Sequence, residues 1–236
     1  MTKRTVDIVL SPLLLPLVEI EGKTVVVIDI LRATSTICAA LHNGAKSVIP
    51  VVSVEDALSY KSSDCLVAGE RNGEKADGFD FGNSPLEYSK EVIQNREVVL
   101  TTTNGTKCIH AALKADEILV GSFFNLTVLT EYLRKQDNSV VLFCSGWKDR
   151  VNLEDTLYAG YIAKALSDTH EMQSDAIEIA LDLVGATYQD PIKYLAKASH
   201  VKRFKRLGNH IDLGVCMEID AHPVVVRYEN GKLVTV

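Results

Sequence analysis

The feature that most constrains this chain is an alternation, from Thr24 onward, of short β-branched apolar runs with segments of helical periodicity. Such alternation is typical of strand–helix–strand units that build a parallel sheet. The strand-like runs are apolar throughout, as expected where helices cover both faces of a sheet. The sequence therefore predicts an α/β fold with three α/β/α layers and a mostly parallel central sheet.

The pattern also predicts where the elements lie. We expect strands over residues 24–28, 47–52, 65–68, 97–101, 117–121 and 139–143. We expect helices over residues 35–43, 54–61, 85–94, 105–114, 126–135, 153–167 and 174–184, and another beginning at Asp190-Pro191. A chain of 236 residues with this composition favours a single domain over 1–236, in which residues 170–236 can form a C-terminal lobe that completes the site.

Composition narrows the partners that this chain can have. A net charge of −6 argues against a protein that follows nucleic-acid phosphates, because such binding requires clustered Lys and Arg. No apolar run approaches the roughly 18 residues of a membrane span. The five cysteines are scattered and form no Cys-x-x-Cys pair, which disfavours disulfide scaffolds and structural zinc. We expect a cytoplasmic protein that binds a small molecule and contacts neither nucleic acid nor membrane.

Reactive side chains follow the predicted strands at the points where the strands end. They are Asp29, Glu70, the run Thr102-Thr103-Asn104, Ser122, and the run Cys144-Ser145-Gly146. In open parallel sheets, ligands bind outside the carboxyl ends of the strands. We therefore expect two carboxylates, several hydroxyls and an amide to meet at one edge.

Asp29 opens a segment suited to phosphate. It is followed by Arg32 and by three hydroxyls at a predicted helix start, Thr34, Ser35 and Thr36, where free backbone amides favour anions. A simple helix cap or turn is the alternative for Asp29. Glu70, at what we expect to be a neighbouring strand end, would supply a second oxygen ligand for Mg²⁺, and a surface ion pair with Arg71 is its alternative.

Two further junctions offer polar groups to a ligand. Thr102, Thr103, Asn104, Gly105 and Thr106 form a strand-to-helix junction that we interpret as a phosphate cradle, with a capped turn as the alternative. The long irregular stretch 69–84 ends at Ser84, whose presence is explained by capping of the helix that follows. Capping does not explain the length of the loop or its polar residues, Asn83 among them, which fit a lid or substrate clamp better.

Cys144 and Arg150 have the spacing of the phosphate loop in cysteine-dependent phosphatases, with Ser145 and Gly146 between them. A buried cysteine at a strand end is the favoured alternative. Asn152 and Asp155 resemble a capping box, and binding of metal or water by Glu154 or Asp155 is comparably plausible. The histidines form no zinc-hydrolase motif.

Taken together, these motifs resemble the 2-phosphosulfolactate phosphatase (ComB) family across nearly the whole chain. The resemblance rests on 29–36, 69–71, 78–85, 102–106, Glu154-Asp155, Ala159-Gly160, Ser199-His200, Leu207-Gly208, Asp212-Leu213, Cys216, Asp220 and Pro223. It implies an α/β fold, dependence on Mg²⁺, and hydrolysis of 2-phospho-3-sulfolactate to 3-sulfolactate and phosphate, a step in coenzyme M biosynthesis. It also implies that Ser199, His200, Arg203 and Asp212 are neighbours of the active site.

The mechanism we expect places Mg²⁺ on Asp29 and Glu70, with Asp155 as a further candidate ligand. Arg32, Thr103, Asn104 and Thr106 would orient the phosphate for in-line displacement, while Arg71 or Arg150 would bind the sulfonate or carboxylate. Water, Asp29 or Cys144 can act as the nucleophile, although Leu31 replaces the second Asp of aspartyl phosphatases. A non-catalytic binding protein for phosphorylated metabolites is the other class of function, and a homodimer is the expected assembly.

Overall fold

The structure is a computed structural model that describes residues 4–62, 64–206 and 211–236. Eleven strands in this part of the chain form one sheet in the order β5-β4-β6-β3-β11-β10-β7-β2-β8-β1-β9. The strands are β1 (Thr5–Val9), β2 (Thr24–Ile28), β3 (Ser47–Pro50), β4 (Cys65–Arg71), β5 (Glu74–Lys75), β6 (Glu97–Thr101), β7 (Glu117–Gly121), β8 (Val140–Cys144), β9 (Glu171–Met172), β10 (Val226–Glu229) and β11 (Lys232–Thr235). All six expected strands are present, with small differences at their ends.

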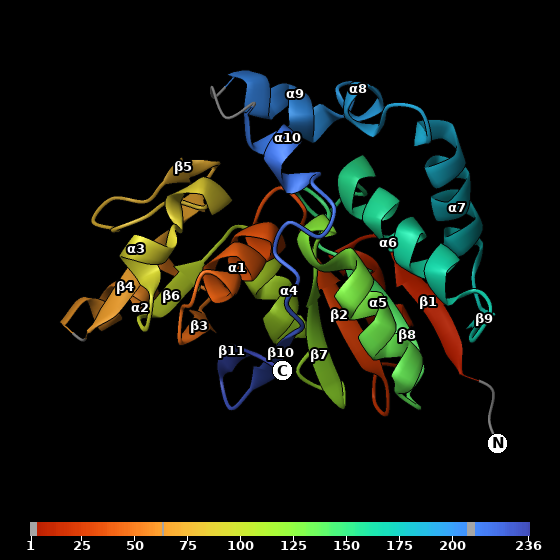
Figure 1. The fold of residues 1–236 in the computed structure, drawn as a ribbon, viewed down its shortest axis with the longest axis horizontal. Coiled ribbons are helices and arrows are strands. Elements are labelled where there is room, and N and C mark those ends of the chain that lie inside the picture. Colours follow the sequence, from red (N-terminus) through yellow and green to blue (C-terminus); the bar gives the residue numbers. More distant parts are fainter. Residues whose placement is uncertain (1–3, 63, 207–210) are drawn as a thin grey trace.

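Helices connect most of the strands (Figure 1). They are α1 (Ala33–His42), α2 (Val54–Ser59), α3 (Lys90–Ile93), α4 (Gly105–Ala111), α5 (Leu126–Lys135), α6 (Leu153–Leu166), α7 (Asp175–Thr187), α8 (Pro191–Leu195), α9 (Ser199–Arg206) and α10 (Ile211–Cys216). None of the helices in the described ranges combines the length and apolar character that crossing a membrane requires.

One expected helix is divided. Instead of a helix over residues 85–94, a 3-10 turn, η3 (Pro85–Glu87), precedes the short helix α3. Tyr88 separates the two with non-helical backbone. Its ring is buried, and its hydroxyl donates a hydrogen bond to the carbonyl of Gly82 at 2.7 Å, which fixes the loop before η3.

Three layers are formed because both faces of the strands are apolar. On one face, Val25, Val27 and Val98 pack with α1 and α4 in a single buried cluster. On the other face, Val26 and Leu142 pack against α5, α6 and α7, and Val67 and Val99 pack with Ala57 of α2. The predicted α/β/α arrangement with a mostly parallel sheet is therefore confirmed.

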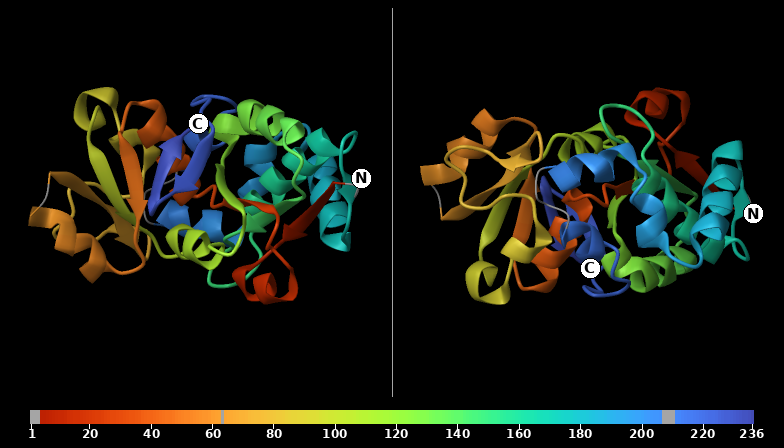
Figure 2. Two further views of the ribbon diagram at one scale, coloured as in Figure 1. Left: turned by 90° about the horizontal axis from the view of Figure 1, so that it is seen from below. Right: turned by 90° about the horizontal axis from the view of Figure 1, so that it is seen from above.

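The sheet consists of two parallel groups joined by a C-terminal hairpin. The strands β4, β6 and β3 form the first parallel group, and β7, β2, β8, β1 and β9 form the second. The antiparallel hairpin β10–β11 lies between β3 and β7 and pairs with both, as the view from below shows (Figure 2, left). This hairpin and the strands β1, β5 and β9 were not predicted from the sequence.

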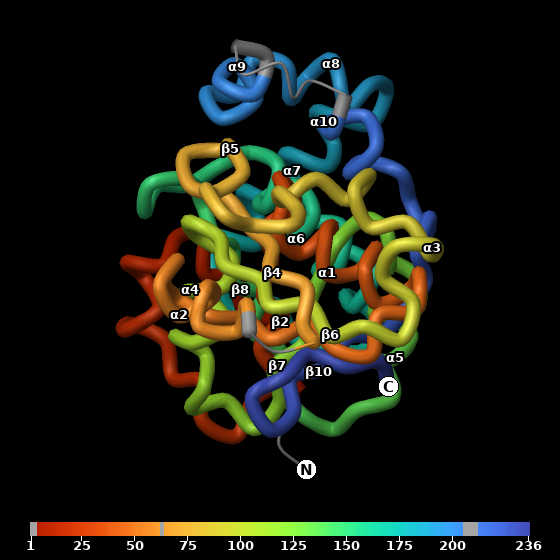
Figure 3. Tube along the Cα trace, turned by 90° about the vertical axis from the view of Figure 1, so that its left-hand side faces the viewer, coloured from red at the N-terminus to blue at the C-terminus, as the bar shows by residue number. Residues whose placement is uncertain are grey.

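The end of the molecule opposite the hairpin is covered by the helices that precede it in the chain. Figure 3 shows α8, α9 and α10 above the remainder of the fold, with β5 below them. In the view from above, the blue helices lie over the middle of the molecule, between the two groups of strands (Figure 2, right). Residues 170–236 thus supply β9, β10 and β11 to the sheet and also α9 and α10 to the cover.

Candidate active site

A pocket of about 550 Å³, counting the space open to solvent, lies beneath α9 at the carboxyl ends of strands from both groups. Asp29 follows β2, Glu70 belongs to β4, and Thr103 and Asn104 follow β6. The remaining lining residues come from the start of α1, the β4–β5 turn, the loop after β8, and α9; they are Leu31, Arg32, Asn72, Gly73, Trp147, Lys148, His200, Arg203 and Phe204.

The expectation that Asp29 and Glu70 follow neighbouring strands is wrong. Five strands separate β4 from β2 in the sheet, and the two carboxylates nevertheless line one pocket. The junction between β6 and α4 connects them. The backbone N–H of Thr103 donates a hydrogen bond to Oε1 of Glu70 at 2.7 Å, and α4 contacts β2. The two acidic side chains thus meet through a third segment.

Gly105 is required at this junction. A β-carbon at position 105 would lie 2.5 Å from the β-carbon of Ala33 and 2.8 Å from Oδ2 of Asp29. Both distances are shorter than van der Waals contact allows, so a larger residue would displace the start of α1 or the Asp29 carboxylate. The glycine that we interpreted as part of a phosphate cradle therefore has a packing role.

Asp29 carries its negative charge in an unfavourable environment. The residue is only 5% exposed. The pKa of Asp29 is raised to about 7, mainly by burial and then by the carboxylates of Asp155 and Glu70, against the lowering effects of His200 and a hydrogen bond with the backbone of Ala33. A carboxyl group whose neighbours are also carboxylates is stabilised in its charged form by a bound cation.

Glu70 is held in place by two backbone donors. Oε2 accepts a hydrogen bond from Gly73 at 2.6 Å, and Oε1 accepts the bond from Thr103. Each carboxylate oxygen has a second lone pair, so both can still bind a ligand. The turn between β4 and β5 therefore fixes the orientation of Glu70 toward the pocket.

Asp155, the third candidate metal ligand, lies behind the pocket rather than in its lining. Its carboxylate accepts hydrogen bonds from the backbone of Ile30 and Gly146 and from the side chains of Ser145 and Asn152, at 2.9–3.1 Å. Burial and the neighbouring Glu154 raise its pKa to about 7. These bonds tie the loops after β2 and β8 to the start of α6, so the geometry points to an anchoring role.

Within the described residues, no group of three or more His, Cys, Asp or Glu side chains is arranged to hold a metal ion. The pair formed by Asp29 and Glu70 still matches the needs of Mg²⁺, which commonly takes one or two carboxylates and completes its coordination with water and substrate oxygens. The donor set thus fits magnesium better than zinc.

The hydroxyl-rich segments form hydrogen bonds within the protein. Oγ1 of Thr34 accepts from the backbone of Asp29, Ser35 donates to the carbonyl of Ile30, and Thr36 donates to the carbonyl of Asn83. Thr102 and Thr106 bond to each other at the start of α4. All five are buried and absent from the pocket lining, and only Thr103 and Asn104 of the predicted cradle reach it.

Arg32 lines the pocket and pairs with Asp212 of α10. The N–O distance is 2.5 Å, the guanidinium lies 5.0 Å from the ring centroid of Phe204, and the Nε atom is buried without a hydrogen-bond partner in the described structure. Ser84 donates to the other oxygen of Asp212 at 2.7 Å, so the loop before η3 is also bound to this pair. Asn83 and Ser84 support the site from outside its lining.

Neither arginine expected to bind the second anionic group of a substrate lines the pocket. The guanidinium of Arg71 donates to the carbonyls of Glu70 and Val52 and to Oγ1 of Thr101. Arg150 is exposed in the turn after β8, where its backbone pairs with Trp147. Lys148 and Arg203 occupy the lining instead; the resemblance implied Arg203 as a neighbour of the site, whereas Lys148 was not expected there.

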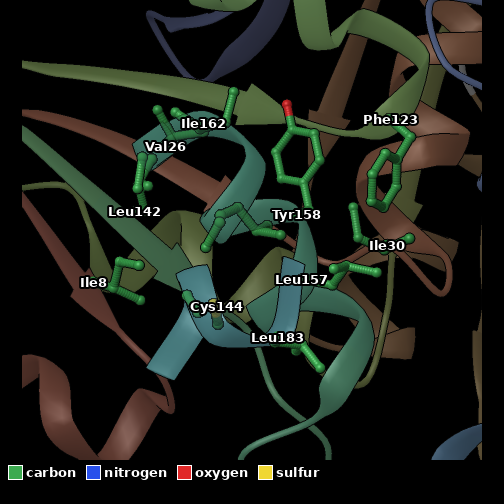
Figure 4. Close-up of a cluster of buried hydrophobic side chains, with 14 of the residues drawn as sticks. Ile8, Val26, Ile30, Phe123, Leu142, Cys144, Leu157, Tyr158, Ile162 and Leu183 are labelled. Carbon is green, nitrogen blue, oxygen red and sulfur yellow. The ribbon is translucent and has the colours of Figure 1, made fainter. Parts of the chain in front are cut away.

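Cys144 lies in the hydrophobic core between the sheet and α6, as Figure 4 shows. Its side chain is fully buried, and burial raises the pKa of the thiol well above its usual range. Ser145 and Gly146, which follow it, bond to Asp155, and Gly146 has a positive φ and a close approach to the carbonyl of Arg150. The spacing that matched a cysteine-dependent phosphate loop therefore corresponds to a structural turn.

Aromatic residues that sequence reasoning missed complete the wall of the pocket. The rings of Trp147 and His200 are stacked with centroids 5.4 Å apart, and Phe204 lies 4.7 Å from His200. Trp147 comes three residues after Cys144 at the end of β8, and Phe204 follows His200 by one helical turn. Their closeness in the sequence to residues already expected in the site was the signal that could have identified them. Leu207 and Gly208, part of the resemblance, lie outside the described residues.

The fold and the pocket define a class: an α/β protein with a small-molecule site at strand ends, where two carboxylates face two arginines and a lysine. Comparison of the sequence with known proteins agrees. The profile of the 2-phosphosulpholactate phosphatase family matches residues 9–231. The chain is 42% identical over 227 residues to a probable 2-phosphosulfolactate phosphatase of Thermotoga maritima, covering 96% of each chain.

Two clostridial relatives are similar over comparable lengths. Proteins named probable 2-phosphosulfolactate phosphatase are 36% identical in Clostridium perfringens, covering 98% of this chain and 96% of the relative, and 37% identical in Clostridium acetobutylicum, covering 91% and 93%. The chain belongs to the 2-phosphosulfolactate phosphatase family.

Proposed function

We propose that this chain is a Mg²⁺-dependent phosphatase that hydrolyses 2-phospho-3-sulfolactate, or a closely similar small phosphorylated hydroxy acid, to 3-sulfolactate and phosphate. Membership of the family supports the reaction class. The single structural observation that carries the proposal is the meeting of Asp29 and Glu70 in a pocket that also contains Arg32, Lys148 and Arg203. Such a pocket has ligands for a hard cation beside groups that bind a polyanion.

Asp29 and Glu70 are the residues that would hold the metal. When bound there, Mg²⁺ would neutralise phosphoryl charge and make the attacking water more acidic. The proposal draws support from the raised pKa of Asp29, because buried carboxylates that lack a cation favour the protonated form. Gly73 and Thr103 keep Glu70 in a fixed orientation, which limits the reorganisation needed on binding.

The substrate carries three anionic groups, and the lining offers three cations. Arg32 has an unpartnered Nε and is fixed by Asp212, so it is suited to a phosphoryl oxygen. Lys148 is exposed at the rim, and Arg203 is fixed to the carbonyl of Asn72 at 2.8 Å. We assign the carboxylate and the sulfonate to these two residues, in place of the Arg71 and Arg150 expected earlier. Thr103 and Asn104 would orient the phosphate.

The experiment is a phosphate-release assay over small phosphorylated acids, including phosphosulfolactate and phospholactate, with Mg²⁺ and with chelator. We expect the Asp29→Asn and Glu70→Gln variants to lose metal-dependent turnover by at least about 100-fold, the scale of losing one electrostatic group from an active site. The matched control is Asp137→Asn, because Asp137 is exposed and remote from the pocket. Full activity of Asp29→Asn would remove that residue from the mechanism.

The same assay separates the alternatives. Cys144→Ser should keep its activity, because the thiol is buried and its pKa is raised; loss of turnover in this variant alone, with no dependence on metal, would select a cysteine nucleophile. A titration of phosphosulfolactate that shows binding without phosphate release would select a non-catalytic binding protein. Family membership favours an enzyme over a binding protein, and the burial of Cys144 disfavours the cysteine route.

A cytoplasmic homodimer is the assembly we propose for this phosphatase. A symmetric dimer is the commonest oligomer of soluble enzymes, and scattered unpaired cysteines suit a reducing compartment. All five cysteines are free in the structure. Sedimentation equilibrium should give twice the chain mass; the mass of one chain would contradict the dimer.

A further inference from the structure

We propose that His200, held by Glu154, is the general acid that protonates the leaving alkoxide oxygen during phosphoester hydrolysis. This inference rests on the proposed function, because it assigns a step of that reaction. The observation behind it is a carboxylate–histidine pair whose second ring nitrogen is available to the pocket.

Glu154 provides the first part of the geometry. It lies in the first turn of α6, and its side chain is fully buried. Oε1 lies 2.6 Å from Nδ1 of His200, while Oε2 is buried and has no hydrogen-bond partner among the described residues. Burying a carboxylate costs free energy unless a partner offsets the lost hydration. The close bond to His200 is the interaction that offsets this cost for Glu154.

The histidine ring is held on three sides. Trp147 stacks on it with an interplanar angle of 14°, Phe204 packs against it at 4.7 Å, and Glu154 bonds to Nδ1. The hydrogen bond that the ring forms within the described residues uses Nδ1, which leaves Nε2 for a ligand, and His200 lines the same pocket as Asp29. This is the arrangement by which a carboxylate fixes the orientation of an imidazole toward a substrate.

The chemistry of the reaction requires such a donor. As the bond between phosphorus and the bridging oxygen breaks, its electron pair goes to the oxygen of a secondary alcohol, which is a poor leaving group unless it receives a proton. In our scheme Nε2–H of the imidazolium gives that proton to the bridging oxygen, water forms the new bond to phosphorus and releases its proton to solvent, and His200 then takes a proton from solvent. Atoms and charge balance.

The other cations of the pocket are less suited to this step. Arg32 and Arg203 stay charged at any pH that the protein tolerates, so they bind oxygen without giving up a proton. Lys148 is exposed, and its Nζ lies over the ring of Trp147, 5.3 Å from the centroid. Unlike these three residues, His200 combines a ring that can transfer a proton with a carboxylate partner that fixes its orientation.

The test compares two substrates that differ in their need for an acid. The leaving group of phospholactate is the alkoxide of lactate, which needs a proton. The leaving group of p-nitrophenyl phosphate is p-nitrophenolate, which is stable without one. We expect His200→Asn to lower kcat on phospholactate by about 10²–10⁴-fold, the usual contribution of general acid catalysis, and to change kcat on p-nitrophenyl phosphate by less than about 10-fold. Equal losses on both substrates would overturn the assignment, because a structural role does not depend on the leaving group.

Two further variants keep the result decisive. His200→Gln is made alongside, and circular dichroism selects whichever variant is folded. Glu154→Gln retains a hydrogen-bonding side chain without its charge. Because Glu154 is a positioning residue, this variant should lose less kcat than His200→Asn, and the loss should again be larger on phospholactate than on p-nitrophenyl phosphate.

The matched control is Lys202→Asn, an exposed position on α9, which should change kcat on neither substrate. If the wild-type protein hydrolyses no phosphoester, the proposed function fails; if it does and His200 variants show no leaving-group dependence, only this inference fails.

Discussion

At the scale of single residues, Gly105 makes the shared pocket possible. The site joins strands from two separate parallel groups, and the β6–α4 junction can approach Asp29 only where no side chain intervenes. Close packing of this kind transmits strain, because interiors have few voids to absorb an added methyl group. Activity and stability are therefore coupled at position 105.

We predict that Gly105→Ala destabilises the protein by about 1–3 kcal/mol, the usual effect of overpacking, and lowers kcat, because the new methyl group would meet Oδ2 of Asp29 and the β-carbon of Ala33. Urea unfolding and phosphate release measure the two effects. The control is Gly185→Ala in α7, where a β-carbon meets nothing within 4 Å and helix propensity favours alanine. If both variants behave alike, the packing argument is wrong.

At the scale of elements, the β10–β11 hairpin holds the two parallel groups of strands together. Asn230 and Gly231 both have positive φ, as a two-residue turn of type I′ requires. Val226 and Leu233 are fully buried between the two groups, and the hairpin pairs with β7 on one side and β3 on the other. Loss of its packing should therefore weaken the whole sheet rather than one edge.

Leu233→Ala tests this role. We expect it to lower the free energy of unfolding by about 2–5 kcal/mol, since it removes a buried side chain and leaves a cavity. Leu113→Ala makes the same chemical change at a residue that is 50% exposed, and it should shift stability by less than about 0.5 kcal/mol. Urea denaturation followed by circular dichroism gives both values. A small effect at Leu233 would mean that the hairpin is not part of the cooperative fold.

This hairpin also shows how far the sequence can be interpreted. The strands from 24 to 143 were predictable because each one is recognisable from its own apolar run. The Asn-Gly turn between β10 and β11 is a local hairpin signal that could have been used, as could the β-branched pattern of β1. The position of the hairpin between β3 and β7 depends on pairing partners more than 100 residues away in the chain, and no local pattern specifies it.

The same limit applies to the site. Several residues that were expected in or beside the site do line the pocket: Asp29, Arg32, Glu70, Thr103, Asn104, His200 and Arg203. Thr34, Ser35, Thr36, Thr102 and Thr106 were expected there too, but a hydroxyl at a helix start bonds to a ligand or to the backbone by the same chemistry. Only the tertiary structure separates the two uses, and it places these five in the backbone network.

At the scale of the whole molecule, folding must place several ionisable groups in environments that oppose their charge. Burial raises the pKa of Asp29 and Asp155 to about 7, so lowering the pH through this range adds protons to the folded state and favours it. His222 acts in the opposite direction. Its ring lies 4.6 Å from Phe124 and 4.9 Å from His42, and Nδ1 is buried without a hydrogen-bond partner in the described structure.

Burial, followed by the charge of His42, lowers the pKa of His222 to about 4 from 6.5. Between these values the unfolded chain binds a proton that folded His222 does not, so its contribution to stability is present above pH 6.5 and is lost as the pH falls toward 4. With allowance for the partial exposure of the ring, we expect a loss of about 1–2 kcal/mol. Comparing wild type with His222→Gln in chelator isolates this contribution, because Asp29 and Asp155 are common to both proteins.

The measurement is urea unfolding of both proteins from pH 7.5 to 4.5. The stability of the wild type relative to His222→Gln should decline as the pH falls. His42→Gln should preserve most of that decline, because burial outweighs the charge of His42 in lowering the pKa of His222. If the difference stays constant with pH, His222 takes up a proton in the folded protein as easily as in the unfolded chain. That result would contradict the lowering of its pKa by burial beside Phe124 and His42.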